Sequence, residues 1–196
     1  MNLPNKITVS RIIMVFIILI LANIYYKFSP HIAYTIQVIT VLLTAVAAYT
    51  DLLDGQIARK YNLVSDFGKL IDPLADKIFV MTIFIIFVDT VNPYTHQSML
   101  PGWVVVVVLA REFLVTGLRS LAVTKGVMIA ADKYGKIKTA SQMGFFAFGA
   151  FIWLNLIPLT GVIKILWGVA MCYVALITIV SGLNYFIKYR HLYLED

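Results

Sequence analysis

Long apolar runs separated by short polar stretches dominate the chain. We count six runs that can each supply the roughly 20 residues that a helix needs to cross a bilayer. They span 7–26, 32–58, 72–91, 101–124, 139–157 and 162–187. Pro30, the pair Asn92 and Pro93, and Pro158 mark the turns at one end of these runs. The pattern predicts an all-α integral membrane protein with six transmembrane helices.

The composition supports this fold class. The 196 residues are 61% hydrophobic and only 13% charged, whereas a soluble domain usually carries about 25% charged residues. No internal repeat or low-complexity tract divides the chain, so we expect a single membrane domain over 1–196. The opening stretch, MNLPNKITVSR, is amphipathic, and Pro4 suits the start of a helix. We expect this N-terminal segment to lie in the membrane interface ahead of the first span.

The basic residues predict the orientation. With six spans, both termini lie on the same side of the membrane. Every Lys and Arg except Lys27 and Lys164 falls on that side or in the helix ends that open to it. The excess of basic residues marks this side as cytoplasmic. The net charge of +6 is then explained by loops that face anionic lipids, and it does not require a nucleic-acid partner.

Acidic residues gather in the stretch 48–77, AYTDLLDGQIARKYNLVSDFGKLIDPLADK. Asp51 and Asp54 end the second run at spacing i, i+3, and Asp72 and Asp76 start the third at spacing i, i+4, so each pair shares a helix face. The uncharged segment 32–50 covers about 28 Å of a hydrocarbon layer about 30 Å thick, which brings both pairs to the same membrane level. Four carboxylates in one cavity would repel one another unless cations intervene. Two divalent cations would balance them, and hard oxygen ligands favour Mg²⁺ or Mn²⁺.

Small residues accompany these acids. Gly55 and Ala58 follow on neighbouring turns of the second helix, and Gly68 precedes the third. Small side chains beside metal ligands leave room for a bulky ligand group, although they also permit tight helix packing. Arg59 lies at the mouth of the site, where it can bind a phosphate.

The pattern that combines these residues resembles the signature of the CDP-alcohol phosphotransferase family. It is Asp51-x-x-Asp54-Gly55-x-x-Ala58-Arg59, then eight residues, then Gly68-x-x-x-Asp72-x-x-x-Asp76. The resemblance implies the family's six-helix fold over the whole chain, a homodimer, and Asp76 as the base that accepts the proton of the attacking hydroxyl. It also implies a binding site for CDP-diacylglycerol, whose residues are Asn5, Thr8, Gly55, Ala58, Arg59 and Gly68.

Four further segments resemble one bacterial branch of that family, the phosphatidylglycerophosphate synthases. They are LPNKITVSR near the start, LIDPLADK in the acidic stretch, REFLVTGLR at 111–119 and GKIKTASQ at 135–142. These enzymes join glycerol 3-phosphate to CDP-diacylglycerol and release CMP. The resemblance implies phospholipid biosynthesis at the bacterial plasma membrane, with the active site on the cytoplasmic side. Cardiolipin, phosphatidylserine and phosphatidylinositol-phosphate synthases are the alternatives within the family.

Basic residues in the second half fit a phosphorylated acceptor. Arg111 lies about 15 Å into the fourth run, where an arginine is costly unless it is paired. Arg119 is about 80° further around the same helix, near enough to reach the same cavity, and Lys136 lies in the next cytoplasmic stretch. We therefore predict that Arg111, Arg119 and Lys136 bind glycerol 3-phosphate. The alternative is an ion pair with Glu112 together with ordinary cytoplasmic lysines.

A divalent-cation transporter is the main rival from another class, because it too would use acidic residues inside a membrane. Transporter sites tend to lie near the bilayer midplane, between broken helices of related halves. Here the acids lie at one edge of the membrane, and no repeat is visible. The sequence therefore favours an enzyme.

Overall fold

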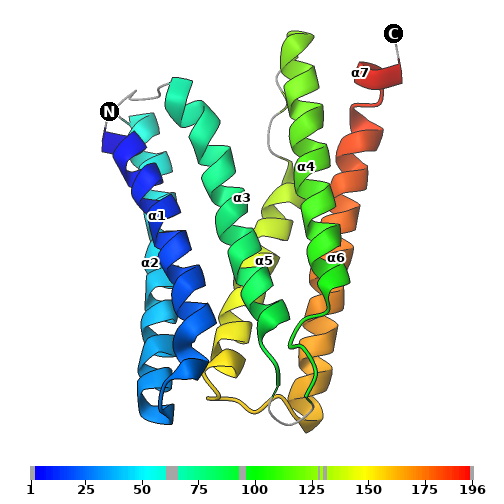
Figure 1. Cartoon of the computed structure of the whole chain (residues 1–196). Coiled ribbons are helices and arrows are strands. Elements are labelled where there is room, and N and C mark those ends of the chain that lie inside the picture. Colours follow the sequence, from blue (N-terminus) through cyan, green and yellow to red (C-terminus); the bar gives the residue numbers. More distant parts are fainter. Residues whose placement is uncertain (1–2, 61–65, 93–95, 128, 130–131, 195–196) are drawn as a thin grey trace. The chain divides into compact units, whose positions relative to one another are not determined.

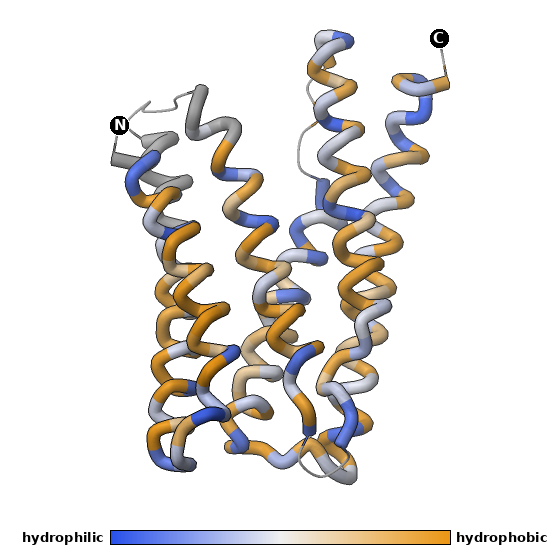
Figure 2. The backbone as a smooth tube through the Cα atoms, in the orientation of Figure 1, coloured by the Kyte–Doolittle hydropathy of each residue, from blue (hydrophilic) through white to orange (hydrophobic). Residues whose placement is uncertain are grey.

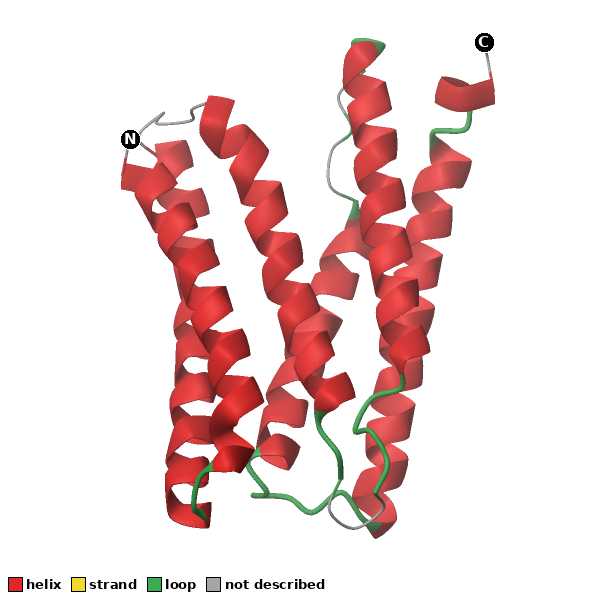
Figure 3. Ribbon diagram, in the orientation of Figure 1, coloured by secondary structure: helices red, strands yellow, loops and turns green. Residues whose placement is uncertain are grey.

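Helices make up nearly all of the described structure (Figures 1 and 3). This computed structural model describes residues 3–60, 66–92, 96–127, 129 and 132–194, without the side chains of 3–4, 52–60, 66–67 and 69–70. The long helices are α1 (Leu3–Ile24), α2 (Pro30–Lys60), α3 (Asp66–Asp89), α4 (Gly102–Thr124), α5 (Lys133–Trp153) and α6 (Gly161–Lys188). A short 3₁₀ turn, Tyr25–Lys27, follows α1, and the short helix α7 covers His191–Leu194.

The helices divide into two compact units. The first, Met1–Asp89, contains α1, α2 and α3. In this unit α1 packs against both α2 and α3, and its core includes Val15 and Ile18 of α1, Ala47 of α2 and Phe84 of α3. The side chain of Thr40 is also buried, and its hydroxyl donates to the Ile36 carbonyl one turn earlier in α2. Such a bond satisfies a hydroxyl within its own helix, which suits an apolar environment.

The second unit, Thr90–Asp196, contains α4, α5 and α6. In this unit α6 packs against both α4 and α5. Trp167 of α6 is buried, its ring stacks on Phe145 of α5 with centroids 4.2 Å apart, and its indole nitrogen donates to the Met99 carbonyl at 2.7 Å. Asn92 donates to the Leu159 carbonyl at 3.1 Å. These bonds hold the loops at the ends of the helices against the core of the unit.

Apolar side chains also cover the outside of the helices, as expected for lipid contact. On α6 the exposed residues include Ile165, Val169, Leu176, Leu183 and Ile187. Figure 2 shows long hydrophobic stretches along α1, α2 and α6. In the described part of the chain, three segments are long and apolar enough to cross a membrane, Asn5–Lys27, Pro30–Asp51 and Gly161–Lys188. The all-α membrane class is confirmed, and six crossings remain a prediction.

All six predicted runs form helices, but several helices extend beyond them. The N-terminal segment expected in the interface continues into α1 without a break. Helix α3 starts at Asp66 and includes Pro73, so Asp72 and Asp76 lie in its second and third turns and not at its start. Helix α5 begins at Lys133 because Asp132 caps it, accepting a hydrogen bond from the Gly135 amide at 2.7 Å. Hydrophobicity marks only the apolar part of a helix, so the polar first turns were left out.

Candidate active site

Three aspartates of the first unit gather around the N-terminal half of α1. Arg11 forms an ion pair with Asp51 of α2, and its Nη1 donates to Asp76 of α3 at 3.0 Å. Three residues earlier on the same helix, the hydroxyl of Thr8 donates to Asp72 at 2.8 Å. We call Asp51, Asp72 and Asp76 the carboxylate cluster. Helix α1 therefore links acids that are more than 20 residues apart in the sequence.

Burial differs sharply between the arginine and its acidic partners. Arg11 is 1% exposed, whereas the side chains of Asp51 and Asp76 are 42% and 54% exposed. A cation beneath two acids lowers their mutual repulsion, and about half of each acidic side chain is exposed. Asn5, also predicted at this site, is buried on α1, and Gly68 is buried near the start of α3.

Four predicted site residues cannot be compared with the structure. Asp54, Gly55, Ala58 and Arg59 belong to α2, but their side chains lie outside the described part of the chain. Their roles stay predictions.

The carboxylate cluster has the donor chemistry that a divalent cation needs. The described residues contain no group of three or more acidic, histidine or cysteine residues that could hold a metal ion. This search does not include the side chain of Asp54. Asp51 and Asp76 both contact one nitrogen of Arg11, so their oxygens lie close together. Hard, accessible carboxylate oxygens are the ligands that Mg²⁺ and Mn²⁺ prefer.

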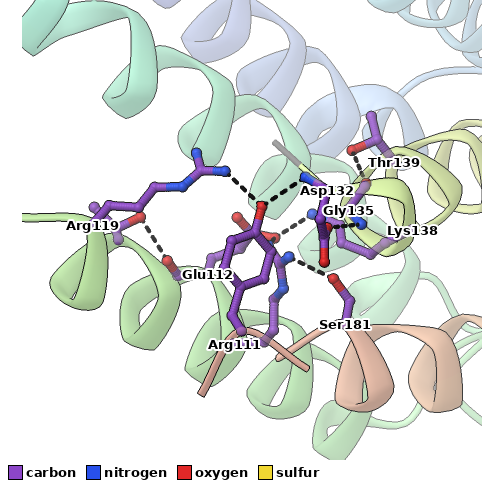
Figure 4. Close-up of polar contacts among 10 residues, drawn as sticks. Arg111, Glu112, Arg119, Asp132, Gly135, Lys138, Thr139 and Ser181 are labelled. Atoms are coloured by element: carbon purple, nitrogen blue, oxygen red, sulfur yellow. Dashed lines mark hydrogen bonds and ion pairs between the residues drawn. The ribbon is translucent and has the colours of Figure 1, made fainter. Parts of the chain in front are cut away.

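Basic residues of the second unit form their own network (Figure 4). Arg111 of α4 donates through Nη2 to the Ser181 hydroxyl of α6 at 2.7 Å, and its Nη1 lies 3.4 Å from Glu112. Glu112 also forms an ion pair with Lys138 of α5. Arg119 donates through Nη2 to the Tyr185 hydroxyl at 2.9 Å. We call Arg111 and Arg119 the arginine cluster.

The ring of Tyr185 brings the two arginines to the same place. The guanidinium carbons of Arg111 and Arg119 lie 5.7 and 5.4 Å from its centroid, within the range of cation–π attraction. Both arginines thus lie against one side chain of α6, and the prediction that they face a shared cavity stays a prediction. The lysines divide: Lys138 is buried against Glu112, and Lys136 is exposed on the first turns of α5. The alternative of a Glu112 ion pair thus holds for Arg111, at 3.4 Å, and Lys138 shares the same acid.

Sequence reasoning missed three residues that organise these clusters. Arg11 was treated only as part of the basic cytoplasmic side, yet an arginine within the first turns of an apolar helix calls for an acidic partner. Asp132 caps α5 and also accepts a hydrogen bond from Asn184 of α6 at 2.6 Å. Tyr185 was not considered, although it lies with Ser181 and Asn184 in a polar stretch of a largely apolar helix, which could have indicated it.

Long apolar helices without strands in the described part of the chain define the class as an all-α membrane protein. The sequence profile of the CDP-alcohol phosphatidyltransferase family matches residues 1–187. The chain belongs to this family, whose members generally depend on a divalent metal.

Curated relatives match along nearly the whole chain. A protein of Bacillus subtilis named CDP-diacylglycerol–glycerol-3-phosphate 3-phosphatidyltransferase is 38% identical, over 95% of this chain and 94% of its own. A protein of the same name from Rickettsia typhi is 35% identical, over 94% and 95%. A probable phosphatidylglycerophosphate synthase of Mycobacterium tuberculosis is 34% identical, over 94% of this chain and 79% of its own.

Proposed function

We propose that this protein transfers the phosphatidyl group of CDP-diacylglycerol to glycerol 3-phosphate and releases CMP. The observation that carries the proposal is that relatives bearing this activity in their names align with this chain almost end to end, and over almost all of their own length. The two clusters support it, because the reaction needs a site for a diphosphate and a site for a phosphorylated acceptor. The four segments that resemble phosphatidylglycerophosphate synthases favour this member of the family over cardiolipin, phosphatidylserine and phosphatidylinositol-phosphate synthases.

The first unit would hold the nucleotide lipid. Asp51, Asp54, Asp72 and Asp76 are the proposed ligands of two divalent cations, Mg²⁺ or Mn²⁺. Bound there, the cations would neutralise the acids and stabilise the negative charge that develops on the departing CMP. The small residues Gly55, Ala58 and Gly68 would leave space for CDP-diacylglycerol, with Arg59 at its phosphates.

The N-terminal half of α1 would complete that site. Thr8 donates to Asp72 and so fixes the direction in which this carboxylate points. Buried Asn5 lies one turn earlier on the same helix, where its amide could reach the nucleotide. Arg11 supplies positive charge beneath Asp51 and Asp76, which lowers the cost of placing acids together.

The transfer would be a direct displacement. A hydroxyl of glycerol 3-phosphate attacks the phosphorus that bears the diacylglycerol, a new oxygen–phosphorus bond forms, and the bond to CMP breaks. Asp76 is the proposed base that accepts the hydroxyl proton. Its side chain is half exposed, so an acceptor molecule can approach it.

The second unit would bind the acceptor's phosphate. Arg111 and Arg119 lie over one tyrosine ring, and planar guanidinium groups form paired hydrogen bonds with phosphate oxygens. Exposed Lys136 would add a third positive charge. Lys138 is left out of this role, because it is buried and lies closer to Glu112 than Arg111 does.

The decisive experiment is an acceptor panel with the purified protein. CDP-diacylglycerol is supplied with glycerol 3-phosphate, serine, inositol phosphate or phosphatidylglycerol, and CMP release is measured. We expect the highest turnover with glycerol 3-phosphate, and at least about a hundredfold less with serine, which has no phosphate to pair with the arginines. Preferred turnover of any other acceptor would assign the chain to a different member of the family.

We further propose a single catalytic domain that forms a homodimer in the bacterial plasma membrane, with both termini and the active site in the cytoplasm. The distribution of Lys and Arg supports this orientation. Cysteine labelling in intact cells and in inverted vesicles tests it, with single cysteines placed at Lys6 and Lys164. Labelling of the Lys6 position from outside intact cells would reverse the orientation.

A further inference from the structure

We propose that Tyr185 is a positioning residue for the acceptor phosphate, because its hydroxyl and its ring together hold Arg119 and Arg111 in place. The proposal rests on the proposed function of these arginines and deepens it. It concerns the way in which two like charges are kept together before the acceptor binds.

The hydroxyl of Tyr185 joins two helices to α6. Its oxygen accepts a hydrogen bond from Arg119 Nη2 of α4 at 2.9 Å and another from the backbone amide of Asp132, the capping residue of α5, at 3.2 Å. A phenolic oxygen has two lone pairs, so these donors use its capacity to accept. Arg119 is thereby tied to the start of the helix that carries Lys136.

The ring of Tyr185 serves both arginines. Each guanidinium lies over it, at 5.7 Å for Arg111 and 5.4 Å for Arg119. A guanidinium that lies on an aromatic face still directs N–H groups outward in its own plane, where they can donate to phosphate oxygens. Tyr185 itself is 1% exposed and packs with Val115 and Leu118 of α4. Its position is thus determined by the core and not by the arginines.

The neighbouring residues of α6 are shaped around Arg111. Ser181, one turn before Tyr185, accepts a hydrogen bond from Arg111 Nη2 at 2.7 Å, and residues four apart share a helix face. Gly182 lies between them, and a Cβ on it would stand 3.0 Å from Arg111 Cγ. Helix α6 therefore fixes the arginine along its length, at the stem by Gly182 and at the tip by Ser181 and Tyr185.

This arrangement matters because two arginines repel each other. Without a rigid partner they would separate, and each would have to be ordered again when a phosphate binds. Fixing side chains beforehand removes part of the entropy cost of binding. Tyr185 should therefore affect the affinity for the acceptor, while leaving the affinity for CDP-diacylglycerol unchanged.

The test compares Tyr185→Phe, Tyr185→Leu and Arg119→Ala with a matched control, Tyr173→Phe, which removes an exposed hydroxyl from the same helix. KM is measured for each substrate separately. Tyr185→Phe should raise the KM for glycerol 3-phosphate about three- to tenfold, which corresponds to about 0.7–1.4 kcal/mol, the typical net contribution of one hydrogen bond. Tyr185→Leu should raise it further, because the ring is lost as well. The KM for CDP-diacylglycerol should stay at the wild-type value in the Tyr185 variants. Tyr173→Phe should keep the wild-type KM for both substrates.

The outcomes separate the two proposals. If Arg119→Ala raises the KM for glycerol 3-phosphate and Tyr185→Phe does not, the positioning role of Tyr185 is wrong, while the proposed acceptor site stands. If Arg119→Ala leaves the acceptor KM unchanged, the proposed acceptor site itself fails. Two results for Tyr185→Phe would make Tyr185 a structural residue only. One is an equal rise in the KM for both substrates. The other is a fall in kcat and in melting temperature with both KM values unchanged. Since phenylalanine keeps the packed ring, this variant tests the proposal even if the leucine variant fails to fold.

Discussion

Replacing Arg11 by Met should destabilise the protein most when no divalent cation is present. Arg11 is buried, and one of its nitrogens contacts both Asp51 and Asp76. Hydrogen bonds to charged groups contribute about 1.5–3 kcal/mol each. Both acids are about half exposed, so water replaces part of this loss. We therefore expect a cost of about 2 kcal/mol in total.

The expected change is measurable as a melting temperature. For a chain of this size, about 2 kcal/mol corresponds to roughly 4–8 °C. The assay follows intrinsic fluorescence of the detergent-purified protein on heating, first in excess EDTA and then in excess Mg²⁺. In Mg²⁺ the difference between Arg11→Met and wild type should shrink, because the bound cation supplies the positive charge that the variant lacks. Arg190→Met removes an exposed arginine and is the matched control.

Two results would refute this reasoning. Equal melting temperatures of Arg11→Met and wild type in EDTA would mean that Arg11 does not hold the acids together. A difference that Mg²⁺ leaves unchanged would mean that the carboxylate cluster binds no cation near Arg11. The melting temperature of Arg11→Lys in EDTA should lie between those of Arg11→Met and wild type, since lysine keeps the charge but not the contact with both acids.

Three further predictions concern the acids. Asp72→Asn should nearly abolish CMP release, and chelation of wild type should do so reversibly; full turnover in excess EDTA would contradict the proposed metal role. Asp76→Asn should lower kcat by roughly 10²–10⁴-fold, as expected for loss of a general base, and a collapse of CMP affinity at unchanged kcat would argue for a nucleotide-binding role instead. Glu112→Gln should cost about 2 kcal/mol of stability, because it leaves the buried Lys138 without its acid. Adding Lys138→Met should restore part of that loss in thermal unfolding, and purely additive effects would show that the pair is not coupled.

The sequence predicted the helices well because hydrophobicity is their dominant signal. Each apolar run became a helix, and the length of the run before Asp51 placed it near the level of Asp76, which Arg11 now links to it. The polar first turns of α3 and α5 were missed, since nothing apolar marks them. Asp132 did carry a signal, because an aspartate is a favoured cap, but a capping residue is recognised only once the start of its helix is suspected.

Contacts between distant residues were harder to predict than the helices. The spacing of Arg111 and Arg119 indicated a shared face of α4, and both do lie over one ring. The ring itself, Tyr185, is 66 residues away from Arg119 in the chain, and periodicity within α6 does not reveal which helix it contacts. The pairing of Lys138, and not Lys136, with Glu112 likewise depends on how α5 is rotated against α4.

The close approach of Gly182 to Arg111 has an evolutionary consequence. The missing Cβ and the long side chain are complementary in size, so the two positions should show epistasis. Gly182→Ala should be harmful beside arginine but nearly neutral beside a residue without a Cγ, such as Ala. A lineage that lost the arginine would be released from the requirement for glycine and could accumulate larger residues at 182. Restoring the arginine later would then require glycine to return at 182 at the same time, so the loss of the arginine would be hard to reverse.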